Sequence, residues 1–173
     1  PLGMYAAKIL HRSIGEIELQ TTRYTTPTGD RIFGITYDKP RAEGEQFAAV
    51  FVIDERQGKI QEIASSAPFS YADNQGFSIQ GLDAKSAKNF SLSLSFRSVC
   101  GGGSYVYKFA ERNGTWRVAG LDTTDYQCDA ENNDIGPNSD ERSKNFLTGL
   151  VIETGYRDRL SRLFIKPTKL FAL

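Results

Sequence analysis

The stretch SLSLSFRSVCGGGSYVYKFAERNGTWRVAGL, residues 91–121, contains three segments in which apolar and polar side chains alternate. A period of two residues is typical of strands that bury one face. Asn113-Gly114, which separates the second segment from the third, is a strong signal for a tight hairpin. We therefore predict a three-stranded antiparallel meander from Ser91 to Leu121.

Related hairpins are predicted in the first half of the chain. The sequence ERQGKI at 55–60 resembles ERNGTW at 111–116, and it separates an apolar segment from a second strand at Lys59–Ile63. Two β-rich segments, EIELQTTRYTT and RIFGITYD, flank a predicted turn at Pro27–Asp30. The chain is therefore expected to be mainly β, with antiparallel meanders and hairpins around a single core.

The evidence for helices is confined to two segments. Tyr5–Ser13 fits one short helix, and YRDRLSRLF at 156–164 fits a helical turn or a strand equally well. FLTGLVIET at 146–154 and RLFIKP at 162–167 are further strand candidates. We expect at most one or two short helices.

Length and composition indicate one domain. The chain has 173 residues, 39% hydrophobic and 24% charged, with a formal net charge of zero. Balanced charge gives no general attraction to nucleic acid, and no apolar segment reaches the length of a membrane span. Residues 1–4 are interpreted as an expression-tag remnant, with Met4 alternatively the native start, and residues 5–173 as a single β-rich domain.

The residue inventory excludes several kinds of site. His11 is the only histidine, so any Ser-His-Asp or Cys-His arrangement would have to use it. One histidine and two cysteines supply neither a two-histidine metal site nor a four-cysteine zinc site. Gly101–Gly103 lacks the Lys-Ser/Thr of a phosphate-binding loop and precedes a strand, so we predict a turn there. We expect a protein without catalytic residues, metal or cofactor.

The two cysteines lie at one end of the predicted meander. Cys100 precedes the second strand and Cys128 follows the third, and in an antiparallel meander these two ends are adjacent. A disulfide between Cys100 and Cys128 is therefore predicted, with two separate thiols as the alternative. A disulfide would indicate an oxidising compartment such as the periplasm.

An acidic region follows the meander. Seven acidic residues lie between Asp122 and Glu141 without an intervening Lys or Arg, and CDAENNDIGPNSDERSK at 128–144 is predicted to be a long loop. Three interpretations remain open: a solvated loop, a calcium site at Asp129, Glu131, Asn133 and Asp140, and a recognition surface for a basic protein. The predicted partner-binding residues are Asp122, Asp125, Tyr126, Asp129, Glu131 and Asp134.

A hydrolase is a further alternative. Asp122 and Asp125 are close in sequence and next to Tyr126, so they are candidates for the paired carboxylates of a glycosidase-type acid and base.

Three segments together resemble a known group of proteins: YVYKF at 105–109, NGTWRVAG at 113–120 and SKNFLTG at 143–149. They are similar to strands of small exported or lipid-anchored proteins of Gram-negative bacteria, some of which resemble periplasmic immunity proteins. The resemblance covers about residues 47–173. It implies a non-enzymatic periplasmic protein that occludes a secreted antibacterial toxin, with an envelope-assembly binding module as the second alternative. The exported leader typical of the group would be absent from this sequence.

Overall fold

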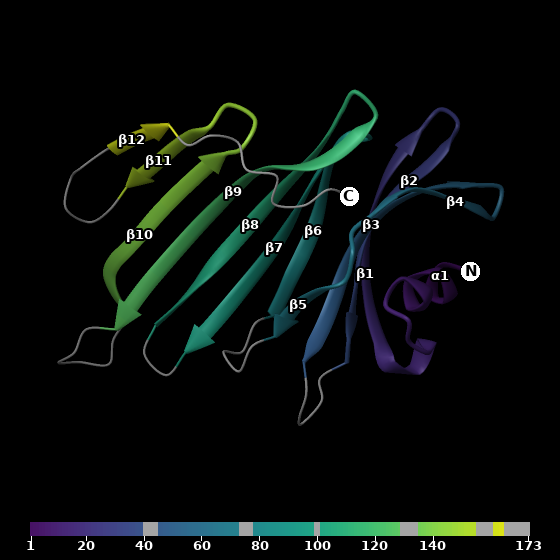
Figure 1. The fold of residues 1–173 in the computed structure, drawn as a ribbon, viewed down its shortest axis with the longest axis horizontal. Coiled ribbons are helices and arrows are strands. Elements are labelled where there is room, and N and C mark those ends of the chain that lie inside the picture. Colours follow the sequence, from purple (N-terminus) through teal and green to yellow (C-terminus); the bar gives the residue numbers. More distant parts are fainter. Residues whose placement is uncertain (40–44, 73–77, 99–100, 129–134, 155–160, 165–173) are drawn as a thin grey trace.

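The residues that the structure describes form two antiparallel β-sheets, one α-helix and a short 3-10 helix at Ile14–Glu16 (Figure 1). The computed structural model describes residues 1–39, 45–72, 78–98, 101–128, 135–154 and 161–164. The expected fold class, mainly β with antiparallel hairpins and few helices, is confirmed.

The N-terminal half forms a five-stranded sheet with the order β1-β2-β3-β4, in which β5 also pairs with β3. Its strands are β1 (Ile17–Thr26), β2 (Gly29–Asp38), β3 (Gln46–Arg56), β4 (Lys59–Ser65) and β5 (Phe69–Ala72). The hairpins predicted around residues 27–30 and 55–58 are both present. In the second, Gln57 and Gly58 have φ values of 50° and 74°, which places both in the left-handed region that a tight hairpin requires.

The C-terminal half forms a seven-stranded sheet in which strands adjacent in sequence are adjacent in space. Its strands are β6 (Ser78–Ser86), β7 (Asn89–Ser98), β8 (Gly101–Arg112), β9 (Thr115–Cys128), β10 (Ile135–Asn145), β11 (Leu150–Thr154) and β12 (Ser161–Phe164). The predicted meander at 91–121 is confirmed as the central part of β7-β8-β9, and Asn113-Gly114 forms its second turn.

Two sequence-based predictions were wrong in this sheet. Residues 135–145, predicted as part of a loop, form strand β10, which pairs with β9 from Asn145↔Gly120 to Ser139↔Tyr126. Gly101–Gly103 is not a turn but the start of β8, paired with residues 96–98 of β7. Both errors arose because the segments lack the alternation that marks a strand, while pairing with a long neighbour supplies the stability.

The main core lies between the two sheets. Phe33, Val50 and Val52 of the first sheet meet Phe90 and Trp116 of the second, and all five are at most 2% exposed. Phe90 stacks on Phe33 at a centroid distance of 4.8 Å and on Phe109 at 4.5 Å. The second sheet contributes apolar side chains from one face only, which explains its alternating sequence.

A second core lies on the other face of the five-stranded sheet, under helix α1 (Leu2–Ile9). Ala6, Ala7 and Leu10 pack there against Phe51 and Ile53. Because both faces of β3 are covered, residues 48–53 are all apolar and buried. The predicted helix is present but begins at Leu2, so residues interpreted as a tag remnant belong to it.

The two sheets are also joined by a polar contact. The Arg31 guanidinium donates from Nε and Nη2 to the two carboxylate oxygens of Asp54, at 2.7 and 2.9 Å. Its Nη1 donates to the carbonyl oxygen of Ala87, in the turn between β6 and β7, at 3.0 Å. The carboxylate holds the Arg31 pKa above its ordinary value. Arg31 thus fixes the first sheet against the second at one end of the core.

Candidate functional site

The predicted site residues Asp122 and Asp125 lie on strand β9 rather than on a loop. The pairing between β8 and β9 is regular from Lys108↔Gly120 to Gly102↔Tyr126. Because side chains alternate along a regular strand, two residues three positions apart face opposite sides of the sheet. Asp122 and Asp125 therefore do not form the paired carboxylates that a glycosidase-type site requires.

Asp125 belongs to the inner face of the seven-stranded sheet, the face that also carries the core. It lies in a row across four strands, Phe96↔Gly103↔Asp125↔Asp140, in which Gly103 has no side chain. A Cβ atom at Gly103 would lie 2.7 Å from Phe96 Cε1 and 2.9 Å from Asp125 Oδ1. The phenyl ring and the carboxylate therefore both lean over the glycine from opposite sides.

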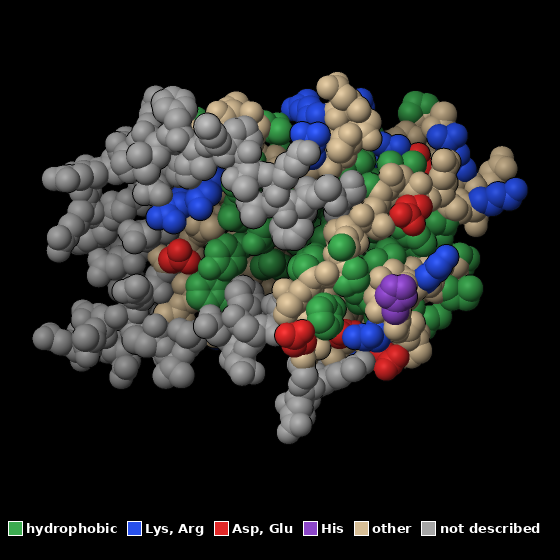
Figure 2. Space-filling view, in the orientation of Figure 1, with side chains coloured by type: hydrophobic (Ala, Val, Ile, Leu, Met, Phe, Trp, Pro, Cys, Tyr) green, Lys and Arg blue, Asp and Glu red, His purple; other side chains and the backbone are tan. Residues whose placement is uncertain are grey.

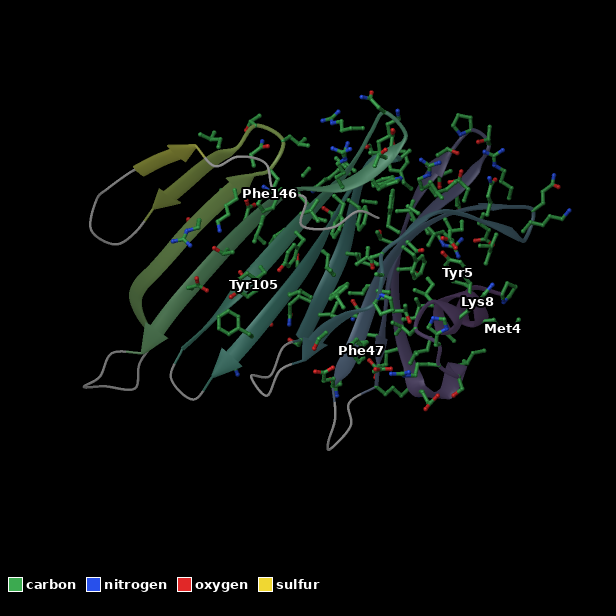
Figure 3. The ribbon with its side chains drawn as sticks, viewed as in Figure 1. Met4, Tyr5, Lys8, Phe47, Tyr105 and Phe146 are labelled. Carbon is green, nitrogen blue, oxygen red and sulfur yellow. The ribbon has the colours of Figure 1, made fainter. Side chains whose placement is uncertain are left out.

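A pair of aromatic rings adjoins this carboxylate. Phe96 stacks on Tyr105 with centroids 5.3 Å apart and an interplanar angle of 18°. Tyr105 projects from the seven-stranded sheet at a distance from helix α1 and the first sheet (Figure 3).

Burial decreases along the inner face toward this site. Phe90 and Leu92 of β7 are each 2% exposed, whereas Leu94 and Phe96 further along the strand are only partly buried. Burial raises the pKa of Tyr107, which lies between the two regions. Figure 2 shows hydrophobic side chains in the middle of the view, bordered by acidic and basic ones. The candidate site is therefore the part of the inner face beyond the sheet-to-sheet core, and Asp125, Gly103, Phe96 and Tyr105 define it.

The Asp125 carboxylate is exposed and forms no hydrogen bond or ion pair with any residue that the structure describes. Arg142 of β10 is diagonally opposite, since its backbone pairs with that of Thr123. The charge of Asp125 is thus available to a partner.

Asp122 lies on the outer face of the same sheet, and its carboxylate, unlike that of Asp125, is paired. Its two carboxylate oxygens accept from Ser143 Oγ at 2.7 Å and from Lys108 Nζ at 2.6 Å. The same face has a shallow depression of about 630 Å³, with Ser91, Ala110 and Gly120 among its lining residues. Asp122 is a structural partner of Lys108 and Ser143, which makes it a weaker candidate for binding than Asp125.

The remaining predicted residues are only partly described. Tyr126 lies on β9, where its backbone pairs with Gly102 and Ser139. Cys128 ends β9 and pairs with Ile135. Asp129, Glu131 and Asp134 lie outside the described residues, as does Cys100, so the disulfide and the greater part of the predicted acidic loop stay predictions.

The calcium interpretation is also largely outside the described residues. Asp140 lies on β10 opposite Asp125, while the other three predicted ligands are not described. In the described ranges, no group of three or more His, Cys, Asp or Glu side chains is arranged to hold a metal ion.

Sequence reasoning missed Phe96, Tyr105 and Gly103 as site residues. The alternation of the two aromatic residues with other side chains on their strands indicates only that they face the buried side of the sheet. A glycine inside a strand often marks a close approach of another group, and this was the available signal for Gly103.

Comparison of the chain with protein-family models, curated proteins and solved structures finds no match. Within the described residues, no helix combines the length and apolar character needed to cross a membrane.

Proposed function

We propose that this protein is a non-enzymatic protein-binding module, most concretely a periplasmic immunity-type inhibitor that occludes a secreted antibacterial toxin. The observation that carries the proposal is the exposed, unpaired carboxylate of Asp125 beside the Phe96–Tyr105 pair. Aromatic residues are enriched at the centres of protein interfaces, and a fixed charge beside them supplies specificity.

The proposed binding surface is built on strands. Phe96, Tyr105 and Asp125 lie on the three adjacent strands β7, β8 and β9, whose ladder is continuous at this end. Side chains held by a ladder lose less conformational freedom on binding than side chains on a mobile loop. In this mechanism the sheet end enters the basic active site of the toxin and excludes its substrate.

The test is co-purification of the partner from the native organism or from cells that express the neighbouring genes. Asp125→Lys is compared with Asp83→Lys, whose native carboxylate is exposed and already paired with Lys85. We expect Asp125→Lys to lower partner affinity at least tenfold, because one attractive charge becomes repulsive, and Asp83→Lys to leave it unchanged.

Two results would contradict the proposal. The first is a partner affinity that is the same for both variants and the unmodified protein. The second is purified protein that hydrolyses a substrate through residues of its own, since an immunity-type inhibitor needs no turnover.

The second candidate function, an envelope-assembly module, is favoured by an edge of the first sheet. Strand β4 pairs only with β3 among the described strands, which leaves one side of its backbone available for an added strand. Proline at an outward-facing backbone position of β4 would block such pairing and leave the Asp125 surface intact. Loss of the partner with this variant, but not with Asp125→Lys, would select the second candidate.

A further inference from the structure

We infer that the outer face of the seven-stranded sheet binds an acidic saccharide, a short chain of sugars that carries carboxylate groups. The ligand lies in the shallow depression of about 630 Å³, with a carboxylate on Arg112 and its hydroxyl groups on neutral side chains of the lining. This face is opposite to the one that carries Asp125, so the inference does not depend on the proposed protein-binding surface.

The depression is built on rows of directly opposed residues, which share one face of the sheet. One row crosses the four strands β7 to β10 and consists of Ser91, Lys108, Gly120 and Asn145. Neighbouring strands are about 4.8 Å apart, so this row is about 14 Å long, which exceeds the width of a single sugar ring. The depression therefore suits a short chain of sugars better than one small anion.

The charged side chains of this face leave arginine without an acidic partner. Two lysines of the face are already paired, at 2.5 and 2.6 Å: Lys85 with Asp83 and Lys108 with Asp122. Arg112 is exposed and forms no ion pair with any residue that the structure describes, and the same holds for Arg117, which is opposite Ala110. A guanidinium binds a carboxylate through two parallel hydrogen bonds, so this face favours an anionic ligand.

The neutral side chains of the lining offer both donors and acceptors. Asn145 Oδ1 accepts from two backbone N–H groups of the turn after β10, which leaves its Nδ2 group to donate to a ligand. Asn89 Nδ2 donates to Ser86 Oγ at 2.9 Å, which leaves its Oδ1 to accept. The Ser91 hydroxyl forms no hydrogen bond within the described part of the chain, so it can do either.

This combination distinguishes an acidic sugar from simpler ligands. A sugar hydroxyl group both donates and accepts, so it can bond to Asn89 Oδ1 as well as to Asn145 Nδ2. A phosphate or carboxylate ion only accepts, and it leaves Asn89 Oδ1 without a donor. A neutral sugar leaves the Arg112 charge without an anion. A carboxylated saccharide is the class of ligand that uses both kinds of group.

The experiment is an NMR titration of the purified chain with a trisaccharide of galacturonic acid. Binding is followed from the side-chain amide signals of Asn89 and Asn145 and from the Gly120 backbone amide. We expect saturable shifts at all three positions. The carboxyl-reduced trisaccharide, which is neutral, should bind about fivefold more weakly, because an exposed ion pair contributes modestly. Tricarballylate, which has three carboxylates and no hydroxyl group, should not saturate these signals.

A double variant tests the role of the two arginines. Arg112→Gln with Arg117→Gln should lower the affinity for the acidic trisaccharide to that for the reduced one, and leave the affinity for the reduced one unchanged. Lys59→Gln is the matched control, since Lys59 is an exposed cation of β4 that forms no ion pair with a described residue. This variant should bind both trisaccharides as the unmodified protein does.

Four results would overturn the inference. The first is the absence of saturable shifts with the acidic trisaccharide, and the second is equal binding of its reduced form. The third is equally tight binding of tricarballylate or of a peptide of three glutamates, which would identify a general anion site. The fourth is full affinity for the acidic trisaccharide in the double variant.

Discussion

At the scale of single residues, the site depends on one position without a side chain. Gly103 is buried in the β8 strand, and a Cβ atom there would meet the Thr124 carbonyl oxygen, the Phe96 ring and the Asp125 carboxylate. Phe96 and Asp125 are side chains that can move, whereas the carbonyl oxygen belongs to the paired backbone of β9. The backbone contact therefore sets the cost of a larger residue.

We predict that Gly103→Ala lowers the free energy of unfolding by about 1–3 kcal/mol, because the added methyl group forces neighbouring atoms apart. Gly15→Ala is the matched control, since no atom lies within 4 Å of a Cβ at that position. Urea unfolding followed by Trp116 fluorescence measures both variants. Equal stability of Gly103→Ala and the unmodified protein would show that β9 moves away without cost.

At the scale of elements, the turn between β8 and β9 is stabilised by a charged side chain. The Glu111 carboxylate lies 2.9 Å from Lys88 Nζ and also accepts from the Gly114 backbone N–H. These two contacts, the lysine first, hold the pKa of Glu111 below its ordinary value of 4.5. Glu111 therefore links the β8–β9 turn to the β6–β7 turn, where Lys88 lies.

This contact predicts a pH dependence of stability. Because the Glu111 pKa is lower in the folded state than in the unfolded chain, the ionised carboxylate stabilises the folded protein. This contribution to the free energy of unfolding is complete above pH 4.5 and is lost as the pH falls from 4.5 through the folded-state pKa. Glu111→Gln should be less stable than the unmodified protein at pH 7, and the difference should shrink toward pH 3. Denaturant unfolding at several pH values measures it.

Glu45→Gln is the control for the pH series, because Glu45 is exposed and contacts no charged residue in the described part of the chain. A difference between Glu111→Gln and the unmodified protein that stays constant from pH 7 to pH 3 would contradict the assigned contacts.

The elements also show what sequence patterns predict and what they do not. The β7-β8-β9 meander was predictable because its alternation and the Asn113-Gly114 turn point to the same structure. Strand β10 was not, because residues 135–145 carry glycine, proline and consecutive polar residues. Residues 135–145 form a strand because they pair with β9, and the local sequence does not encode this contact.

At the scale of the whole molecule, the candidate site follows from unequal coverage of two sheets. The first sheet is covered by helix α1 on one face and by the second sheet on the other, and residues 48–53 of its strand β3 are all apolar and buried. The second sheet is longer than the core it shares with the first, so part of its inner face extends beyond that core. Asp125 was chosen as a candidate from its charge alone, and its binding role stays a prediction. The face on which it lies could not be predicted, because the sequence did not show that β9 extends past residue 121 to Cys128.

The predicted disulfide between Cys100 and Cys128 concerns the same end of the sheet. The described ladder between β8 and β9 ends at Gly102↔Tyr126, and Cys128 ends β9. Cys100 lies outside the described residues, so its pairing with Cys128 stays a prediction from chain order. The predicted bond would cross-link the end of β9 to the segment that joins β7 to β8.

We predict that the intact mass of the protein purified from an oxidising compartment rises by two hydrogen atoms on reduction, and that either Cys→Ser variant loses about 3–4 kcal/mol of stability, the value expected for closing a loop of this length. The double variant is the decisive comparison. Removing the second cysteine after the first should cost nothing further, because the bond is already lost. Additive costs in the double variant would identify two independent thiols, and the oxidising compartment inferred from the bond would lose its support.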